Sequence, residues 1–373
     1  MAVNERLAEI FALCEGTKSS DVHLACGEIP RFRMQGQLTP HPAFGRLDDG
    51  QVDDIAMSLG LETLPVGCPD GTERVRATLM REGSIDGAVT SPGGTRYRFN
   101  IYRESGATAV ALRRLDGEFR SLEELGLPPQ LANFCECPDG LVVVTGPTGC
   151  GKSTTLATLI DMINRTRQGH VITLEDPIEF RHVSNRCLVS QRQIGRDAKS
   201  FGEALVEALR QDPDVILVGE MRDLVTVRTA LSAAETGHLV FATLHSGDCA
   251  GAIERLVSVF PAEEQDGVRR QLALTLRGIF AQHLLPAVGG GRVAACELMV
   301  NTVAVANMIA TGRSAHVRAA IETGFSHGMV TLDRSLAGLL ERGLIGEAAA
   351  MALSRSPETL RRRMVSARSG ENG

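Results

Sequence analysis

The sequence predicts an α/β fold with a parallel sheet covered by helices, preceded by a smaller α+β domain. From Leu131 onward, short apolar runs alternate with helical patterns, which is typical of parallel sheets. Before residue 115, strand and helix patterns mix without that alternation. A length of 373 residues, 43% of them hydrophobic, suits two domains with full cores.

Residues 1–115 are expected to form the first domain. Leu7, Ile10, Phe11 and Cys14 recur at helical spacing, and Gly93-Gly94 predicts a hairpin turn. Glycine and proline enrichment over 116–130 predicts a linker, so the second domain covers 131–373. The elements expected in the first domain are strands at 22–24, 31–34, 88–90 and 96–102 and a helix at 47–60.

Four buried strands are expected in the second domain, and polar residues follow each of them. In open α/β sheets, ligands bind at the carboxyl ends of the strands. The polar residues should therefore form one site rather than four separate motifs. The expected strands are 141–145, 170–174, 215–218 and 239–244.

A phosphate-binding loop follows the first of these strands. Its glycines allow successive backbone N–H groups to surround phosphate oxygens. The N-terminus of the next helix faces the same phosphate group. Lys152 supplies a charge to the β- and γ-phosphates, and the Ser153 hydroxyl is placed to ligate Mg²⁺. This pattern predicts binding of a nucleoside triphosphate such as ATP. The loop residues are Gly146, Pro147, Thr148, Gly149, Cys150, Gly151, Lys152, Ser153 and Thr154.

Carboxylates follow the second and third strands. Glu220 ends an apolar strand, so we expect it to hold Mg²⁺ through water or to position the attacking water. Glu175, Asp176 and Glu179 form a second acidic cluster, which Pro177 turns toward the site. At least one of them should act on water or metal, and the sequence does not choose between Glu175 and Glu179.

Two histidines bracket the fourth strand. His238 precedes it and His245 follows it, so they should lie at opposite ends. His245, at the carboxyl end, is the better candidate for sensing the γ-phosphate. His238 is expected to cap or contact a neighbour.

The rest of the second domain is expected to be mainly helical. Residues 268–285 form a strongly apolar segment that we interpret as a core helix, followed by a strand at 294–299. Three more helices are expected at 301–312, 329–342 and 345–353.

Composition limits the partners and the compartment. The net charge of −6 argues against a broad basic face for nucleic acid, and no nucleic-acid partner is expected. Nine scattered cysteines without a C-x-x-C pair indicate reduced thiols and the cytosol. The first residues do not resemble a signal peptide, and no run reaches the about 18 apolar residues of a membrane span. Membrane association is therefore expected only through partners.

These motifs, in this order, resemble the ATPases that drive type II secretion and type IV pili. The closest resemblance is to the PilT-type pilus-retraction ATPases, and it covers almost the whole chain. It is carried by 20–24, 96–100, 146–153, 174–179, 212–223 and 236–245.

The resemblance implies a RecA-like ATPase domain behind a PAS-like N-terminal domain. It further implies a homohexameric ring that docks on an inner-membrane pilus platform protein and uses ATP and Mg²⁺ to depolymerise the fibre. Arg98 and Arg113 match arginines thought to reach nucleotide in this family, so we expect them to act across a subunit interface. Assembly-type relatives carry a further N-terminal domain and a four-cysteine motif, and their absence here favours retraction.

The chain departs from the family pattern at three positions. Ala306 and Ala310 replace two arginines of a C-terminal motif, although Arg313 retains its final base, and His283 stands where arginine is usual. These changes bear on retraction of a standard pilus rather than on ATP chemistry.

Several alternatives stay open. They are a pilus-assembly or type II secretion ATPase, an accessory retraction paralogue, a nucleic-acid-dependent RecA-like motor, and a regulator that binds ATP without hydrolysing it. Intact Lys152, Ser153 and Glu220 argue against the last of these.

Overall fold

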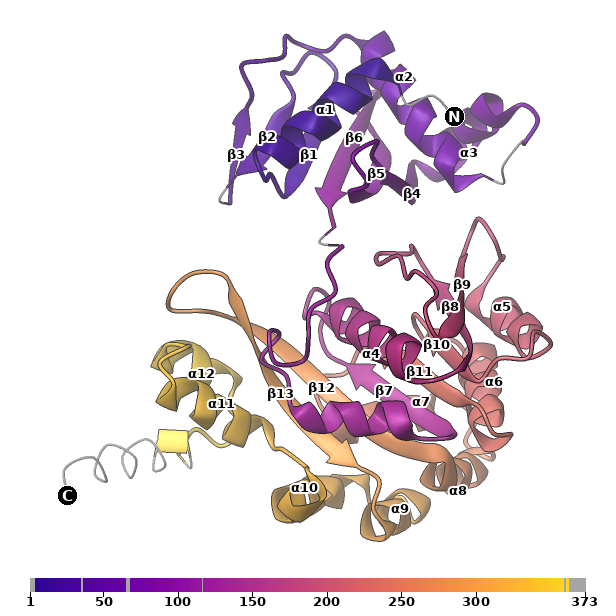
Figure 1. Cartoon of the computed structure of the whole chain (residues 1–373), viewed down its shortest axis with the longest axis vertical. Coiled ribbons are helices and arrows are strands. Elements are labelled where there is room, and N and C mark those ends of the chain that lie inside the picture. Colours follow the sequence, from indigo (N-terminus) through magenta and orange to yellow (C-terminus); the bar gives the residue numbers. More distant parts are fainter. Residues whose placement is uncertain (1–3, 35, 65–67, 116, 359, 362–373) are drawn as a thin grey trace. The chain divides into compact units, whose positions relative to one another are not determined.

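The chain forms two compact units. The structure, a computed structural model, describes residues 4–34, 36–64, 68–115, 117–358 and 360–361 (Figure 1). The sequence predicts that the N-terminal stretch is not a signal peptide. Residues 1–3 of that stretch lie outside the described residues. The first unit contains the described residues up to Glu118 together with Glu175–His182 and Gln191–Ser200, and the second contains the rest.

The first unit is built on a six-stranded sheet in the order β3-β2-β1-β6-β5-β4, in which every neighbouring pair is antiparallel. The hairpin expected around Gly93-Gly94 joins β4 and β5, and Gly94 has φ 86°. Its strands are β1 (Asp21–Ala25), β2 (Arg31–Met34), β3 (Gln37–Pro40), β4 (Ser84–Thr90), β5 (Arg96–Glu104) and β6 (Ala107–Arg114). Its helices are α1 (Glu5–Gly16), α2 (Asp49–Gly60), the short η1 (Leu61–Thr63) and α3 (Gly71–Glu82).

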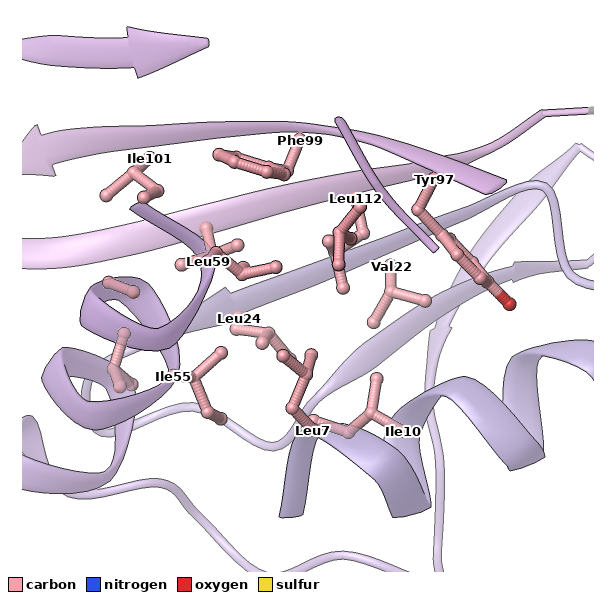
Figure 2. Packing of buried hydrophobic residues seen from close by; sticks show 14 of the residues in the cluster. Leu7, Ile10, Val22, Leu24, Ile55, Leu59, Tyr97, Phe99, Ile101 and Leu112 are labelled. Carbon is pink, nitrogen blue, oxygen red and sulfur yellow. The ribbon is translucent and has the colours of Figure 1, made fainter. Parts of the chain in front are cut away.

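Helices α1 and α2 cover one face of this sheet. Leu7 and Ile10 point from α1 toward Val22 of β1, and Ile55 of α2 lies beside Leu24 (Figure 2). All of them are at most 1% exposed. The opposite face of the sheet therefore carries the polar side chains of the same strands.

The second unit contains a seven-stranded sheet in the order β13-β12-β7-β11-β10-β8-β9. The pairs from β12 through β7, β11 and β10 to β8 are parallel, and β13 is antiparallel to β12. The strands are β7 (Gly140–Thr145), β8 (Gly169–Glu175), β9 (Cys187–Gln193), β10 (Val215–Val218), β11 (Leu239–Leu244), β12 (Leu276–Pro286) and β13 (Arg292–Val300).

Helices surround this sheet and continue beyond it. Capping side chains start several of them; Asp223 accepts from Thr226 N, and Asp248 accepts from Gly251 N. The α-helices are α4 (Lys152–Thr166), α5 (Phe201–Ala208), α6 (Leu224–Glu235), α7 (Cys249–Ser258), α8 (Gln265–Thr275), α9 (Val303–Ala310), α10 (Val317–Thr323), α11 (Leu332–Glu341) and α12 (Glu347–Leu353). Short 3₁₀ turns are η2 (Pro129–Glu136), η3 (Ser314–His316) and η4 (Gly324–His327).

The predicted fold class is confirmed, and so are the four strands that precede the polar motifs. The helix predicted over 268–285 is wrong, because α8 ends at Thr275 and the remaining residues form β12. This strand lies between β7 and β13 and is buried along most of its length, so its sequence is a nearly continuous apolar run. Such a run cannot be distinguished from a buried helix by periodicity alone.

Within the described parts of the chain, none of the helices combines the length and the apolar character needed to span a bilayer.

Candidate active site

The phosphate loop lies between β7 and α4 and has the backbone of an anion cradle. Gly146, Gly149 and Gly151 all have positive φ, at 145°, 76° and 95°. A Cβ on Gly146 would lie 2.2 Å from the carbonyl oxygen of Gln282, so the loop closely approaches β12. Glycine is therefore required at the first loop position for space as well as for conformation. Cys150, in the same loop, is buried, and burial raises the pKa of its thiol.

Lys152 folds back over the loop that it follows. Its Nζ donates to the carbonyl oxygens of Gly146 at 2.9 Å and Pro147 at 3.0 Å. Burial lowers the pKa of Lys152, while the charge of Glu220 acts in the opposite direction. The ammonium group thus lies at the loop, with Ser153 and Thr154 next to it in the first turn of α4.

Strand β12 packs against the phosphate loop and fixes its position. The Thr155 hydroxyl donates to Gln282 Oε1 at 2.6 Å, and a Cβ on Gly151 would lie 2.9 Å from Gln282 Nε2. Gln282 is only 4% exposed. Arg292, at the start of β13, donates to the Gly149 carbonyl at 3.5 Å. Neither Gln282 nor Arg292 is among the site residues that the sequence predicts. A glutamine within the apolar run 276–286 was the one available signal.

Glu220 follows β10 and is held by two basic side chains. Arg222 Nε lies 2.5 Å and His245 Nε2 lies 3.1 Å from Glu220 Oε1. Burial alone would raise the pKa of Glu220, but the hydrogen bonds and charges of Arg222 and His245 lower it below its usual value. The carboxylate is therefore ionised at neutral pH and fixed in orientation.

The two histidines lie at opposite ends of β11, as the sequence predicts. His245 contacts Glu220 at the carboxyl end, whereas His238 Nδ1 lies 3.0 Å from the Ala233 carbonyl of α6 at the other end. The residue after His245 is tied to the end of β7. Ser246 N donates to Thr145 Oγ1 at 2.8 Å, and that hydroxyl donates to Ser246 O at 2.9 Å.

The acidic segment that begins at Glu175, the last residue of β8, belongs to the first unit. Gln191 Nε2 donates to Glu175 Oε1 at 3.0 Å, and Glu179 is half-buried. Arg96 donates to the Ile178 carbonyl through Nε at 3.2 Å and Nη2 at 2.7 Å. Burial, followed by the charge of Arg181, lowers the pKa of Arg96 to about 10, so it remains charged. Arg96 thus serves to hold this segment.

The two predicted arginines, Arg98 and Arg113, lie on the polar face of the first unit's sheet. Arg98 of β5 and Arg113 of β6 are direct cross-strand partners, and Asp21 of β1 is the next partner in the row. Arg113 Nε donates to Asp21 Oδ1 at 2.9 Å, and Arg33 Nε lies 3.5 Å from Asp21 Oδ2. Burial alone would raise the pKa of Asp21, but hydrogen bonds from Arg113 and Ser20 lower it.

These side chains line a shallow groove of about 270 Å³. The side chains of Arg98 and Arg113 are 45% and 71% exposed, so both are accessible from solvent.

The three departures from the family pattern lie in the second unit. Ala306 and Ala310 are half-buried residues of α9. His283 of β12 has its Nε2 3.0 Å from the carbonyl oxygen of Gly247, in the loop that follows His245.

The second unit brings Lys152, Glu220 and His245 to the carboxyl ends of β7, β10 and β11. His238 lies at the opposite end of β11. Glu175, Glu179, Arg98 and Arg113 belong to the first unit.

Known proteins resemble this chain over nearly its full length. It is 42% identical over 352 residues to the "Type IV pilus retractation ATPase PilT" of Pseudomonas aeruginosa, covering 94% of this chain and 99% of that protein. A "Twitching motility protein" of Neisseria gonorrhoeae is 44% identical over 277 residues, 74% of each chain.

The structure of "the Pilus Retraction Motor PilT and Bound ADP" matches with a TM-score of 0.85 and 41% identity, covering 95% of this chain and 99% of that one. These comparisons confirm the predicted resemblance and the prediction that the chain is an ATPase that binds nucleotide.

The model of the family described as "Type II/IV secretion system protein" matches residues 96–331, which contain all four polar motifs at the strand ends. The chain belongs to the type II/IV secretion system protein family.

Proposed function

We propose that this chain is the ATP-hydrolysing motor of type IV pilus retraction, working as a homohexameric ring. Hydrolysis is supported above all by the Glu220 carboxylate, which Arg222 and His245 hold ionised at the strand end. Retraction is supported by the likeness to a retraction ATPase over 99% of that protein's length.

The phosphates of ATP bind against the backbone N–H groups of the phosphate loop and the ammonium of Lys152. Mg²⁺ keeps several waters and takes few protein ligands, which suits the exposed Ser153 hydroxyl and one carboxylate, Glu220, partly through water. When bound, Mg²⁺ neutralises charge on the phosphates.

Glu220 orients the attacking water and accepts its proton. The water oxygen forms a bond to the γ-phosphorus, the bond from that phosphorus to the bridging oxygen breaks, and the products are ADP and phosphate. His245 keeps Glu220 in place and senses the γ-phosphate. Glu175 or Glu179 supplies a second carboxylate to water or metal, and His238 contacts α6 rather than substrate.

The ring brings the first domain of one subunit to the nucleotide of another. Residues 1–115 and 131–373 act as separate domains, joined by the 116–130 linker. Their motion lets Arg98 and Arg113 neutralise charge that develops on the transferring phosphoryl group, an effect of about 10³–10⁵-fold for an arginine finger. Both side chains are exposed, so they can reach a nucleotide once Arg113 leaves Asp21 and Arg98 leaves Asp86.

Mixed rings test this arrangement. Arg98→Ala or Arg113→Ala should lower turnover far more than ATP affinity. Subunits carrying Arg113→Ala and subunits carrying Lys152→Ala should recover activity when mixed, because one interface then has both an intact loop and an intact arginine. If verified subunit exchange gives no recovery, the arginines do not act across the interface.

The ring reaches the cytoplasmic side of the inner membrane through a pilus platform protein. ATPase activity measured alone, with DNA, and with the cytoplasmic domain of a platform protein tests the partner class. Stimulation by the platform domain supports the proposal, whereas stimulation by DNA supports a nucleic-acid motor.

Retraction itself is tested in a piliated bacterium that lacks its own retraction ATPase. The wild-type chain should restore twitching, and Lys152→Ala should not. A chain that hydrolyses ATP but restores twitching only beside an active retraction ATPase would instead be an accessory paralogue. Ala306 and Ala310 favour that second candidate.

A further inference from the structure

The loop between β11 and α7 is held by two side chains at a single carbonyl group. Gly247 O lies 3.0 Å from His283 Nε2 of β12 and 3.0 Å from Arg355 Nη2. Arg355 follows α12, more than a hundred residues later in the chain. The loop that begins at His245 is therefore fixed from the C-terminal part of the second unit.

Arg355 also pairs with the carboxylates of Asp248, the N-cap of α7, and Glu297 of β13. Its Nη1 lies 2.6 Å from Asp248 Oδ2 and 3.6 Å from Glu297 Oε2. Asp248 caps α7 through Gly251 N, and Glu297 accepts from Cys249 N at 2.9 Å. The Glu297 side chain is only 5% exposed. One planar guanidinium thus donates to a carbonyl and forms ion pairs with two carboxylates at once, which a lysine ammonium cannot reproduce.

The opposite end of the same loop reaches the catalytic residues. His245 Nε2 lies 3.1 Å from Glu220 Oε1, and Ser246 N donates a hydrogen bond to Thr145 Oγ1. Thr145 is the residue directly before the phosphate loop. Only Ser246 separates His245 from Gly247. A shift of the Gly247 backbone must therefore either displace His245 or break the hydrogen bond between Ser246 and Thr145.

The backbone of Arg355 is in turn anchored to α11. Asp333 Oδ1, in the first turn of α11, accepts from Arg355 N at 3.1 Å and from Ser354 Oγ at 2.7 Å. Helix α11 packs on β13 (Figure 1). The position of Arg355 is thereby set by the C-terminal helices.

We propose that Arg355 is a positioning residue for hydrolysis: it holds Gly247 and Asp248 so that His245 keeps Glu220 in its working orientation. The proposal rests on the roles assigned to Glu220 and His245 above. It makes turnover sensitive to the placement of α11 and α12. The competing explanation is that Arg355 only neutralises the buried charge of Glu297.

Two variants separate these explanations. Arg355→Lys keeps the charge that pairs with Glu297 but cannot also bond Gly247. The double variant Arg355→Met with Glu297→Gln removes both charges, so no buried carboxylate is left unpaired. Both should fold, and positioning predicts that kcat falls about 10- to 100-fold while KM for ATP changes little.

Arg342→Ala is the matched control, because this exposed arginine of the same region bonds only back to Gly338 of its own helix among the contacts described. It should keep the wild-type kcat. Ring signals of His245 in NMR spectra, assigned by their loss in His245→Gln, should shift in Arg355→Lys and stay in place in Arg342→Ala.

The full-length protein is assayed with His245→Gln and Glu220→Gln in parallel. If those two hydrolyse ATP at the wild-type rate, the proposed catalytic roles fail, and the role of Arg355 fails with them. If they are slow while Arg355→Lys or the double variant has the wild-type kcat, only the positioning role is overturned.

Discussion

Replacing Gly146 with alanine should prevent the phosphate loop from adopting its folded shape. Gly146 has φ 145°, and an added Cβ would lie 2.2 Å from the Gln282 carbonyl oxygen and 2.7 Å from Cys150 Sγ. The sulfur can rotate away. The carbonyl cannot, because Gln282 is paired with Cys296 of β13 and directly follows Ala281, which is paired with Thr145 of β7.

Two costs contribute to the effect. A non-glycine residue in such a backbone conformation costs about 1–3 kcal/mol. Forcing extra atoms into a packed site costs about 1–3 kcal/mol more. Gly149→Ala is the matched control from the same loop, since its φ of 76° costs about 1–2 kcal/mol and no protein atom lies within 4 Å of its added Cβ.

The midpoints of these ranges are about 4 kcal/mol for Gly146→Ala and about 1.5 kcal/mol for Gly149→Ala. Their difference of about 2–3 kcal/mol should appear in the thermal unfolding of the protein without nucleotide. For a unit of this size, each kcal/mol shifts Tm by about 2–4 °C, so Gly146→Ala should unfold about 4–12 °C below Gly149→Ala. Circular dichroism measures both transitions, and a fluorescent ATP analogue reports whether the loop still binds. Equal Tm values for the two variants would refute this account of the loop.

Glu220→Gln should retain ATP binding and slow hydrolysis about 10²- to 10⁴-fold, whereas Lys152→Ala should lose tight binding; wild-type turnover in Glu220→Gln would remove its assigned role. Because the pKa of Glu220 is lowered in the folded protein, its ionic contribution to stability is complete above the ordinary glutamate pKa of about 4.3 and is lost as the pH falls through the lowered value. The Tm difference between wild type and Glu220→Gln should therefore shrink in acid, and a difference that stays constant from pH 7 to pH 3 would contradict this. Iodoacetamide at pH 8 should modify exposed Cys26 and spare Cys150, whose thiol is buried and has a raised pKa; mass spectrometry of peptides that shows equal labelling would contradict the burial of the loop.

The catalytic strands could be predicted because each is a short apolar run with polar residues directly after it. Burial on both faces of a parallel sheet produces such runs, and the carboxyl ends of neighbouring strands lie along one edge. His245 and His238 are therefore predicted at opposite ends of β11, where the structure has them.

The contacts through which β12 holds the phosphate loop could not be predicted in the same way. Leu276 to Leu285 is as apolar as a buried helix, and nothing in the sequence shows that Gly278 must accommodate the Phe134 ring, which lies 2.2 Å from an added Cβ. The contacts of Gln282 depend on pairing between strands that are far apart in the chain. Such tertiary contacts leave no periodic signal.

The position of β7 in its sheet has a consequence for synthesis of the chain. Both partners of β7 come later in the sequence: β11 begins at Leu239, and β12 begins at Leu276. At a ribosomal rate of about 5–20 residues per second, β7 stays without either neighbour for about 5–20 s after it is made. An apolar strand with two open edges is prone to pair with other chains. Chaperone capture during translation should therefore centre on Leu141–Thr145 and end once β12 has emerged.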